Sequence, residues 1–421
     1  TGQANVAIGQ QSSQNITSGI RNTVVGNTAH YRNSTGGYNV VIGYTAGREH
    51  IGSNAVLIGN QAGYYATASA NVFVGYHAGK GSDSLPYSSG GRNVGVGYES
   101  QLNFTTGEYN TSVGHQSLRS NSTGVRNTSL GYRALYGSSG NSTNNNVAIG
   151  SDSLYSISTG GYNVAVGDNA LYGLTTGNYS VGIGWRAGQY NIGSQNVLIG
   201  YGTGQGSSGN TTGGSNTAVG RESINAVTTG HSNVTMGYRS GYSLTTGYEN
   251  VLLGTNAAYT TTGLQHAVVI GQNAGYNITT NAEGVVIIGN EAGHALTTGR
   301  YNLAIGMNAL RSVTTSNYNV AVGEDAGRNH TGGYSTFVGY QAGLNNKVDF
   351  NTAIGWAAMA KIGDTVGGGH GEKNIAIGPS AMAGGDDTVV NNTGNENIAI
   401  GMSTLGGATL STDGDAFTAH H

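Results

Sequence analysis

The sequence predicts an all-β protein, a parallel β-solenoid or β-roll of about 23 coils. A short unit of the form Asn-Val-Ala-Ile-Gly returns along the chain, as at Asn5–Gly9 and Asn163–Gly167. Of the 22 spacings between the glycines that end these units, eleven are 17 residues and five are 16. Glycine supplies 75 of the 421 residues, and no segment keeps a helical period. Such a short fixed period, with no helix pattern, is typical of stacked coils of strands and turns.

Each place in the repeat has its own chemistry, and we number places from the glycine that ends the unit, the repeat glycine. Positions −3 and −1 are β-branched or long aliphatic, and alternation sets both on one face of a short strand. Position +3 is Ala, Ser or Thr in all 23 units, so we expect another backbone to pass close there. Position −7 is Gly in 17 units, which predicts a turn with positive φ. Each coil should then hold two short strands and two turns.

Position −4 is Asn in 18 of the 23 units. Asn at a fixed place in a coil can stack its side-chain amide on the Asn of the next coil, about 4.8 Å away. We therefore expect an asparagine ladder, with the alternative that these residues only open turns.

Position −2 should point away from positions −3 and −1, yet it is also apolar in 18 units, including Leu252 and Phe337. Strands that are apolar on both faces are buried on both faces. We therefore expect the −2 row to meet other copies of the chain, most simply in a parallel homotrimer. The alternative is a flatter roll that stays monomeric.

The unit N-[VT]-x-[VIL]-G-x-x-[AST] resembles the head repeats of trimeric autotransporter adhesins, where a similar S-V-A-I-G strand winds into a left-handed parallel β-roll within a homotrimer. The longer form TTG-x-Y-N-V-A-I-G-x-x-A-L is similar to repeats of phage tail fibres and related virion fibres, which often precede a C-terminal chaperone domain. The resemblance covers Thr1 to about Gly406. It implies a rod domain over 1–406 and a C-terminal tail over 407–421 that leads to a further domain. The 17-residue coil is longer than the usual autotransporter head coil, which leaves the handedness open.

Composition excludes several classes of function. The net charge is −3, so the chain has no broad basic field that would attract nucleic acid. It also lacks a run of about 18 apolar residues, which a membrane-spanning helix would need. No phosphate loop or zinc spacing is present. The adjacent acids Asp386 and Asp387 would point apart in a strand, and so would not act as a catalytic pair. We expect no enzyme activity and no cofactor, with calcium at the loop residues Asp386, Asp387, Asp413 and Asp415 as the alternative to a site without metal.

Two features point to recognition. Tyr and Trp recur at positions +1, +5 and −5, where stacked rings would brace neighbouring coils or dock on sugars. Insertions at Gly79–Arg92, Gly204–Ser215, Lys361–Lys373 and Gly384–Glu396 enter one part of the coil and should emerge on one side. The alternative is that the last two insertions only cap the solenoid. The expected receptor contacts are Lys361, Asp364, His370, Glu372, Lys373, Asp386, Asp387, Trp185 and Trp356.

The sequence therefore favours a structural fibre or adhesin segment of an extracellular attachment organelle, on a virion fibre or a bacterial cell surface. Its expected partners are copies of itself and cell-surface glycans. One alternative is a self-assembling extracellular matrix filament. A second, ice binding, is disfavoured because the TTG threonines lie in turns rather than on a flat T-x-T strand face.

Overall fold

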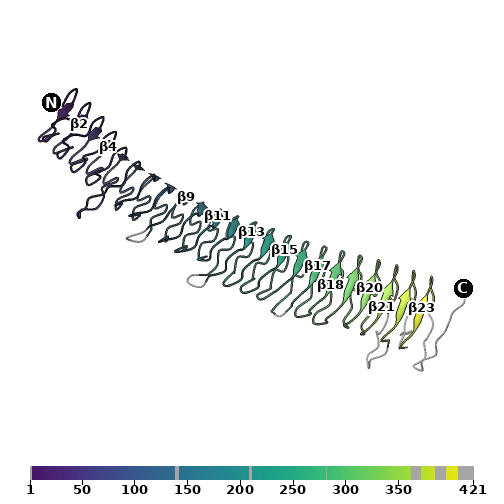
Figure 1. Cartoon of the computed structure of the whole chain (residues 1–421). Helices are drawn as coiled ribbons and strands as arrows, with labels where there is room; N and C mark the ends of the chain where they lie inside the picture. Colours follow the sequence, from purple (N-terminus) through teal and green to yellow (C-terminus); the bar gives the residue numbers. More distant parts are fainter. Residues whose placement is uncertain are drawn as a thin grey trace. The chain divides into compact units, whose positions relative to one another are not determined.

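The computed structural model describes residues 2–137, 142–207, 211–280, 282–361, 371–384 and 395–405. The chain forms two compact units, Thr1–Gly214 and Ser215–His421, and each is a succession of similar narrow coils with one strand per coil (Figure 1). Every strand is three residues long. The first unit holds β1 (Val6–Ile8), β2 (Thr23–Val25), β3 (Val40–Ile42), β4 (Val56–Ile58), β5 (Val72–Val74), β6 (Val94–Val96), β7 (Thr111–Val113), β8 (Thr128–Leu130), β9 (Val147–Ile149), β10 (Val164–Val166), β11 (Val181–Ile183) and β12 (Val197–Ile199). The second holds β13 (Thr217–Val219), β14 (Val234–Met236), β15 (Val251–Leu253), β16 (Val268–Ile270), β17 (Val286–Ile288), β18 (Leu303–Ile305), β19 (Val320–Val322), β20 (Thr336–Val338), β21 (Thr352–Ile354), β22 (Ile375–Ile377) and β23 (Ile398–Ile400).

Within each unit the strands pair in parallel and in register with the strands of the neighbouring coils. Val164 in β10 lies opposite Val181 in β11, for example, and Val166 lies opposite Ile183. The described residues contain no helix. The predicted parallel β-solenoid with repeats of about 17 residues is therefore confirmed.

The predicted second strand of each coil is wrong, because the rest of the described coil consists of turns. Residues at +2 and +4 adopt left-handed backbone angles, as in Asn169 (φ 56°) and Leu171 (φ 49°), and an extended strand cannot continue through them. The turns still bond from coil to coil. The amide of Asn169 donates to the carbonyl of Ser151 at 2.9 Å, and that of Leu171 donates to Ala187 at 2.9 Å.

The repeat glycine and the glycine at −7 are required for different reasons. Repeat glycines have φ between +124° and +144°, and a Cβ on Gly167 would lie 2.6 Å from the carbonyl oxygen of Gly184. Only glycine adopts this conformation readily. The positive φ predicted at −7 is wrong except at Gly371 (φ 100°): it falls at −5 instead, as in Tyr179 (φ 58°). At −7 the constraint is space, because a Cβ on Gly177 would lie 2.9 Å from the backbone carbonyl oxygen of Gly193 and 2.5 Å from the side chain of Leu174.

The two faces of the strand are the reverse of those predicted. Leu252 and Phe337, at −2, are fully buried in the core of their own chain and do not point toward a partner. Positions −3 and −1 lie on the outside of the sheet instead. The coil is so narrow that inward side chains from one chain, at −2, +3, +4 and +7, are enough to fill it. The small residues at +3 are buried as well, for example Ala170.

Core positions −2 and +4 compensate for each other in size. Leu57 at −2 occurs with Gly63 at +4, where a Cβ would lie 2.6 Å from Cδ2 of Leu57. In another coil the pattern reverses, with Ala148 at −2 and a fully buried Leu154 at +4. Close packing thus holds in each coil although the large side chain changes place.

The asparagine ladder at −4 is confirmed. Nδ2 of Asn127 donates to Oδ1 of Asn110 at 3.0 Å and to the carbonyl of Thr143 at 2.7 Å. Its own Oδ1 accepts the backbone amide of Asn146 at 3.0 Å. Because Asn127 is only 1% exposed, each ladder bond satisfies a polar group that would otherwise be buried without a partner.

Candidate functional site

The most extensive functional feature is the outer face of the sheet, which we define as the side chains at positions −3 and −1 of the strands. All are Val, Ile, Leu, Met or Thr, and none is charged. Many are solvent-exposed, including Ile183 (37%), Met236 (51%) and Ile354 (38%). Each unit thus presents to solvent an uncharged strip two residues wide, which is apolar at every −1 position and carries some threonines at −3. Contiguous exposed apolar surface of this kind marks an interaction site.

Aromatic rows at +1 and −5 border the outer face, each separated from its strand by one residue. At +1, Tyr76 stacks on Tyr98 with ring centroids 5.2 Å apart. At −5, Tyr318 stacks between Tyr301 (5.3 Å) and Tyr334 (5.0 Å). The prediction that stacked rings brace neighbouring coils is confirmed. An inner ring such as Tyr318 has both faces covered, so it presents only its edge and its hydroxyl to a ligand.

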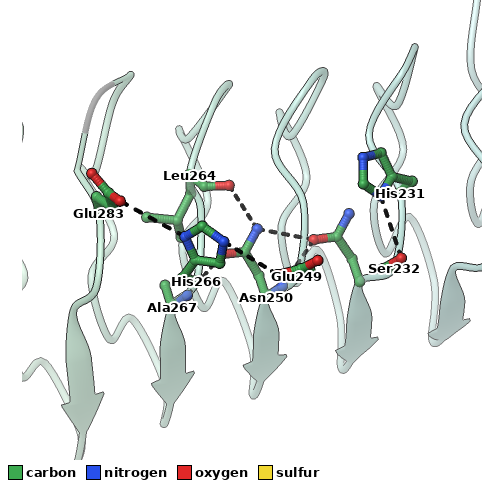
Figure 2. A network of polar contacts seen from close by, with 9 residues as sticks. His231, Ser232, Glu249, Asn250, Leu264, His266, Ala267 and Glu283 are labelled. Carbon is green, nitrogen blue, oxygen red and sulfur yellow. Dashed lines mark hydrogen bonds and ion pairs between the residues drawn. The ribbon is translucent and has the colours of Figure 1, made fainter.

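In one stretch of the second unit, the −5 row holds a histidine that stands between two carboxylates instead of a tyrosine stack (Figure 2). Nε2 of His266 lies 3.2 Å from Oε2 of Glu249, and Nδ1 lies 3.8 Å from Oε1 of Glu283. All three side chains are substantially exposed, so solvent screens their attraction and each contact contributes little stability. The carboxylates face opposite nitrogens and do not converge on one point. In the described part of the chain, no three His, Asp or Glu side chains are placed to hold a metal ion.

Other ionic contacts tie successive coils together. Nε of Arg311 lies 2.7 Å from Oε2 of Glu291, and Nε of Arg239 lies 2.7 Å from Oε2 of Glu222. In both pairs the hydrogen bond from the arginine lowers the pKa of the glutamate carboxyl. These acids are therefore ionised and held in pairs, which suits a brace and not a general acid.

Three buried histidines, His30, His50 and His330, were not predicted from the sequence. His30 and His50 stack with centroids 5.5 Å apart, and burial lowers the pKa of His30 to about 3, with a further contribution from His50. Burial lowers the pKa of His330 to about 4, and its Nδ1 lies 2.7 Å from the carbonyl of Asn346. All three occupy inward positions +4 or +7, as part of the core. The only sequence signal was their place in the repeat.

The predicted receptor contacts do not form one site in the described residues. Asp364, His370, Asp386 and Asp387 lie outside those residues, as does the tail over 407–421. Lys361 is exposed, Nζ of Lys373 pairs with Oε1 of Glu396 at 3.2 Å, and the amide of Glu372 donates to Oδ1 of Asn395.

The two tryptophans belong to different units. The ring of Trp185 stacks on Tyr201 at 4.4 Å, and the guanidinium of Arg186 lies 4.0 Å from its centroid. Trp356, 56% exposed, lies 6.4 Å from the ring of Tyr340. Both tryptophans therefore belong to the +1 aromatic row that borders the outer face.

One insertion, Gly79–Arg92, is fully described, and an open hollow of about 270 Å³ lies between its first residues and Leu102–Thr105 of the next coil. A more open groove of about 400 Å³ lies between the Thr298–Tyr301 and Thr315–Tyr318 turns of the second unit. Both hollows are lined mainly by polar residues.

No protein-family model matches the chain, and no curated protein matches it in sequence. Among the described residues, no helix has the length and apolar character needed to cross a bilayer.

Proposed function

We propose that the chain is a structural segment of a fibre or adhesin in an attachment organelle, outside the cell, on a virion or a bacterial surface. The observation that carries this proposal is the uncharged apolar outer face on successive strands of both units. A chain that worked as a monomer would leave the strip of each unit exposed to solvent. Copies of the chain that pack outer face to outer face would bury it.

The preferred assembly is a parallel homotrimer. Every coil presents the same kind of strip, so a parallel arrangement lets each coil meet the equivalent coils of its partners. In such a rotationally symmetric assembly the same patch of every copy faces the axis. The stacked aromatic rows at +1 and −5 would then flank the interface. The sequence resemblance to adhesin heads and tail fibres favours three copies over two.

The chain would act mechanically and not as an enzyme. Its arginine–carboxylate pairs join coils, and its histidines at the core are held neutral by burial. Such a rod holds a receptor-binding region away from a particle and contributes glycan contacts along its side. The alternative is a matrix filament in which rods join end to end.

Light scattering at micromolar concentration tests the assembly, with Ile183→Asp on the outer face and Thr176→Asp as the matched control. Ile183 is on the outer face, whereas Thr176 is exposed in a turn of the preceding coil. We expect three times the chain mass of 42.7 kDa for the unmodified chain and the control, and a smaller assembly for Ile183→Asp. A mass that grows with concentration would favour the filament, and a monomer throughout would refute the proposed assembly.

A further inference from the structure

We propose that the Gly79–Arg92 insertion forms a binding site for a single neutral sugar ring, a glycan contact of the proposed attachment segment. This inference deepens the proposed function and rests on it. The 17-residue rhythm is broken here by extra residues, since Gly75 and Gly97 are 22 residues apart. Recognition is often carried by such loops on a rigid repeat scaffold.

The base of the loop is fixed to the body of the solenoid. The amide of Gly81 donates to the carbonyl of Leu102 in the next coil at 2.9 Å. The amide of Ser82 donates to Oγ of Ser88 at 2.8 Å, and that fully buried hydroxyl donates to the carbonyl of Phe104 at 2.6 Å. A ring contact between Tyr65 and Tyr87, with centroids 5.1 Å apart, holds the returning arm. The hollow beside this base is therefore formed in advance of ligand binding.

The hollow has the size and polarity for one pyranose ring. It measures about 270 Å³, and its lining includes the side chains of His77, Lys80, Ser82, Asp83 and Asn103. These supply an ammonium, a carboxylate, a hydroxyl, an amide and an imidazole within one small space. Leu102 adds an apolar patch for the C–H face of a ring.

The mixture of charges selects the ligand class. Burial, and then the neighbouring charge of Lys80, lower the pKa of His77, so its ring is neutral at neutral pH and offers one donor and one acceptor. Asp83 opposes a strongly anionic ligand, while Lys80 opposes a cationic one. Within the described residues neither Lys80 nor Asp83 forms an ion pair, so both can bind ligand. Sugar hydroxyls donate and accept at once and match this lining.

Saturation-transfer NMR and calorimetry with methyl glycosides of glucose, galactose and mannose, on the assembled chain, test the site. We expect one or more of these neutral glycosides to bind, and Asp83→Ala to weaken binding about tenfold or more by removing a charged acceptor. Lys80→Met should weaken it similarly, while Asp83→Asn should keep part of the affinity.

The matched control is Glu108→Ala, which removes an acid from the neighbouring coil outside the hollow. Binding that survives Asp83→Ala, binding only to acidic sugars, or no binding of neutral glycosides would each overturn the inference. The assembly mass is measured on the same samples. A trimer that binds no sugar would overturn the sugar site and support the proposed assembly. A monomer that binds sugar would support the site and overturn the proposed assembly.

Discussion

Exchanging the large and small core residues of one coil should preserve the fold where either single change damages it. Leu57 is fully buried, and Leu57→Ala should cost about 2–5 kcal/mol through lost contacts and a residual cavity. Gly63→Leu alone would drive a side chain into Leu57, since its Cβ would lie 2.6 Å from Cδ2, and should cost about 1–3 kcal/mol from overpacking. A left-handed backbone (φ 59°) adds about 1–2 kcal/mol for a non-glycine residue.

The double variant reproduces the arrangement that the chain already uses at Ala148 and Leu154, where Leu154 has φ 49°. The new leucine fills the cavity, so we expect a favourable coupling of about 2 kcal/mol or more in urea unfolding followed by circular dichroism. As a control, Leu57→Ala with Gly293→Leu places the leucine in the other unit and should show no coupling. Strictly additive free energies in the Leu57–Gly63 pair would refute the size compensation.

Three further changes test the core and the surface ladders. Burial lowers the pKa of His30 to about 3. Between about pH 3 and pH 6.5 the unfolded chain therefore binds a proton at this histidine that the folded chain does not bind. The contribution of His30 to stability should therefore be fully present above pH 6.5 and fall by up to about 1.4 kcal/mol per pH unit toward pH 3, and His30→Leu should remove this part of the pH dependence in urea titrations at several pH values. Asn127→Ala leaves the carbonyl of Thr143 without its donor and should cost about 2–4 kcal/mol, seen as a lower urea midpoint. Tyr318→Ala removes two ring stacks and should cost about 1–2 kcal/mol, whereas Tyr318→Phe should be near neutral in thermal melts; equal effects would contradict stacking as the cause.

The period and the chemistry of fixed positions were enough to predict the solenoid, the asparagine ladder and the stacked rings. These features depend on one residue meeting its equivalent in the next coil, which a repeat displays directly. The direction of the strand faces was not predictable in the same way. Positions −2 and −1 are both apolar, and only the inward +4 and +7 side chains, such as Leu154 and Ile157, decide which of them lies inside.

The residue with positive φ was also predicted at the wrong position, and there is a physical reason for this. Glycine at −7 suggested positive φ, but glycine also serves where two backbones meet closely, and Gly177 is of that kind. The left-handed positions hold ordinary side chains such as Tyr179 and Leu171, which coil-to-coil hydrogen bonds hold in place. The hollow beneath Gly79–Arg92 depends on how a loop folds back on its neighbours, and no spacing in the sequence encodes that.

Spin labels on the outer face test most directly whether other copies cover it. The chain contains no cysteine, so Ile183→Cys and the turn control Thr176→Cys each accept a single label without background. In a parallel assembly through the outer face, the labels at Ile183 of different copies approach one another and their spectrum shows dipolar broadening, while labels at Thr176 do not. Spectra without broadening at Ile183, from a chain whose mass remains 42.7 kDa, would contradict the account.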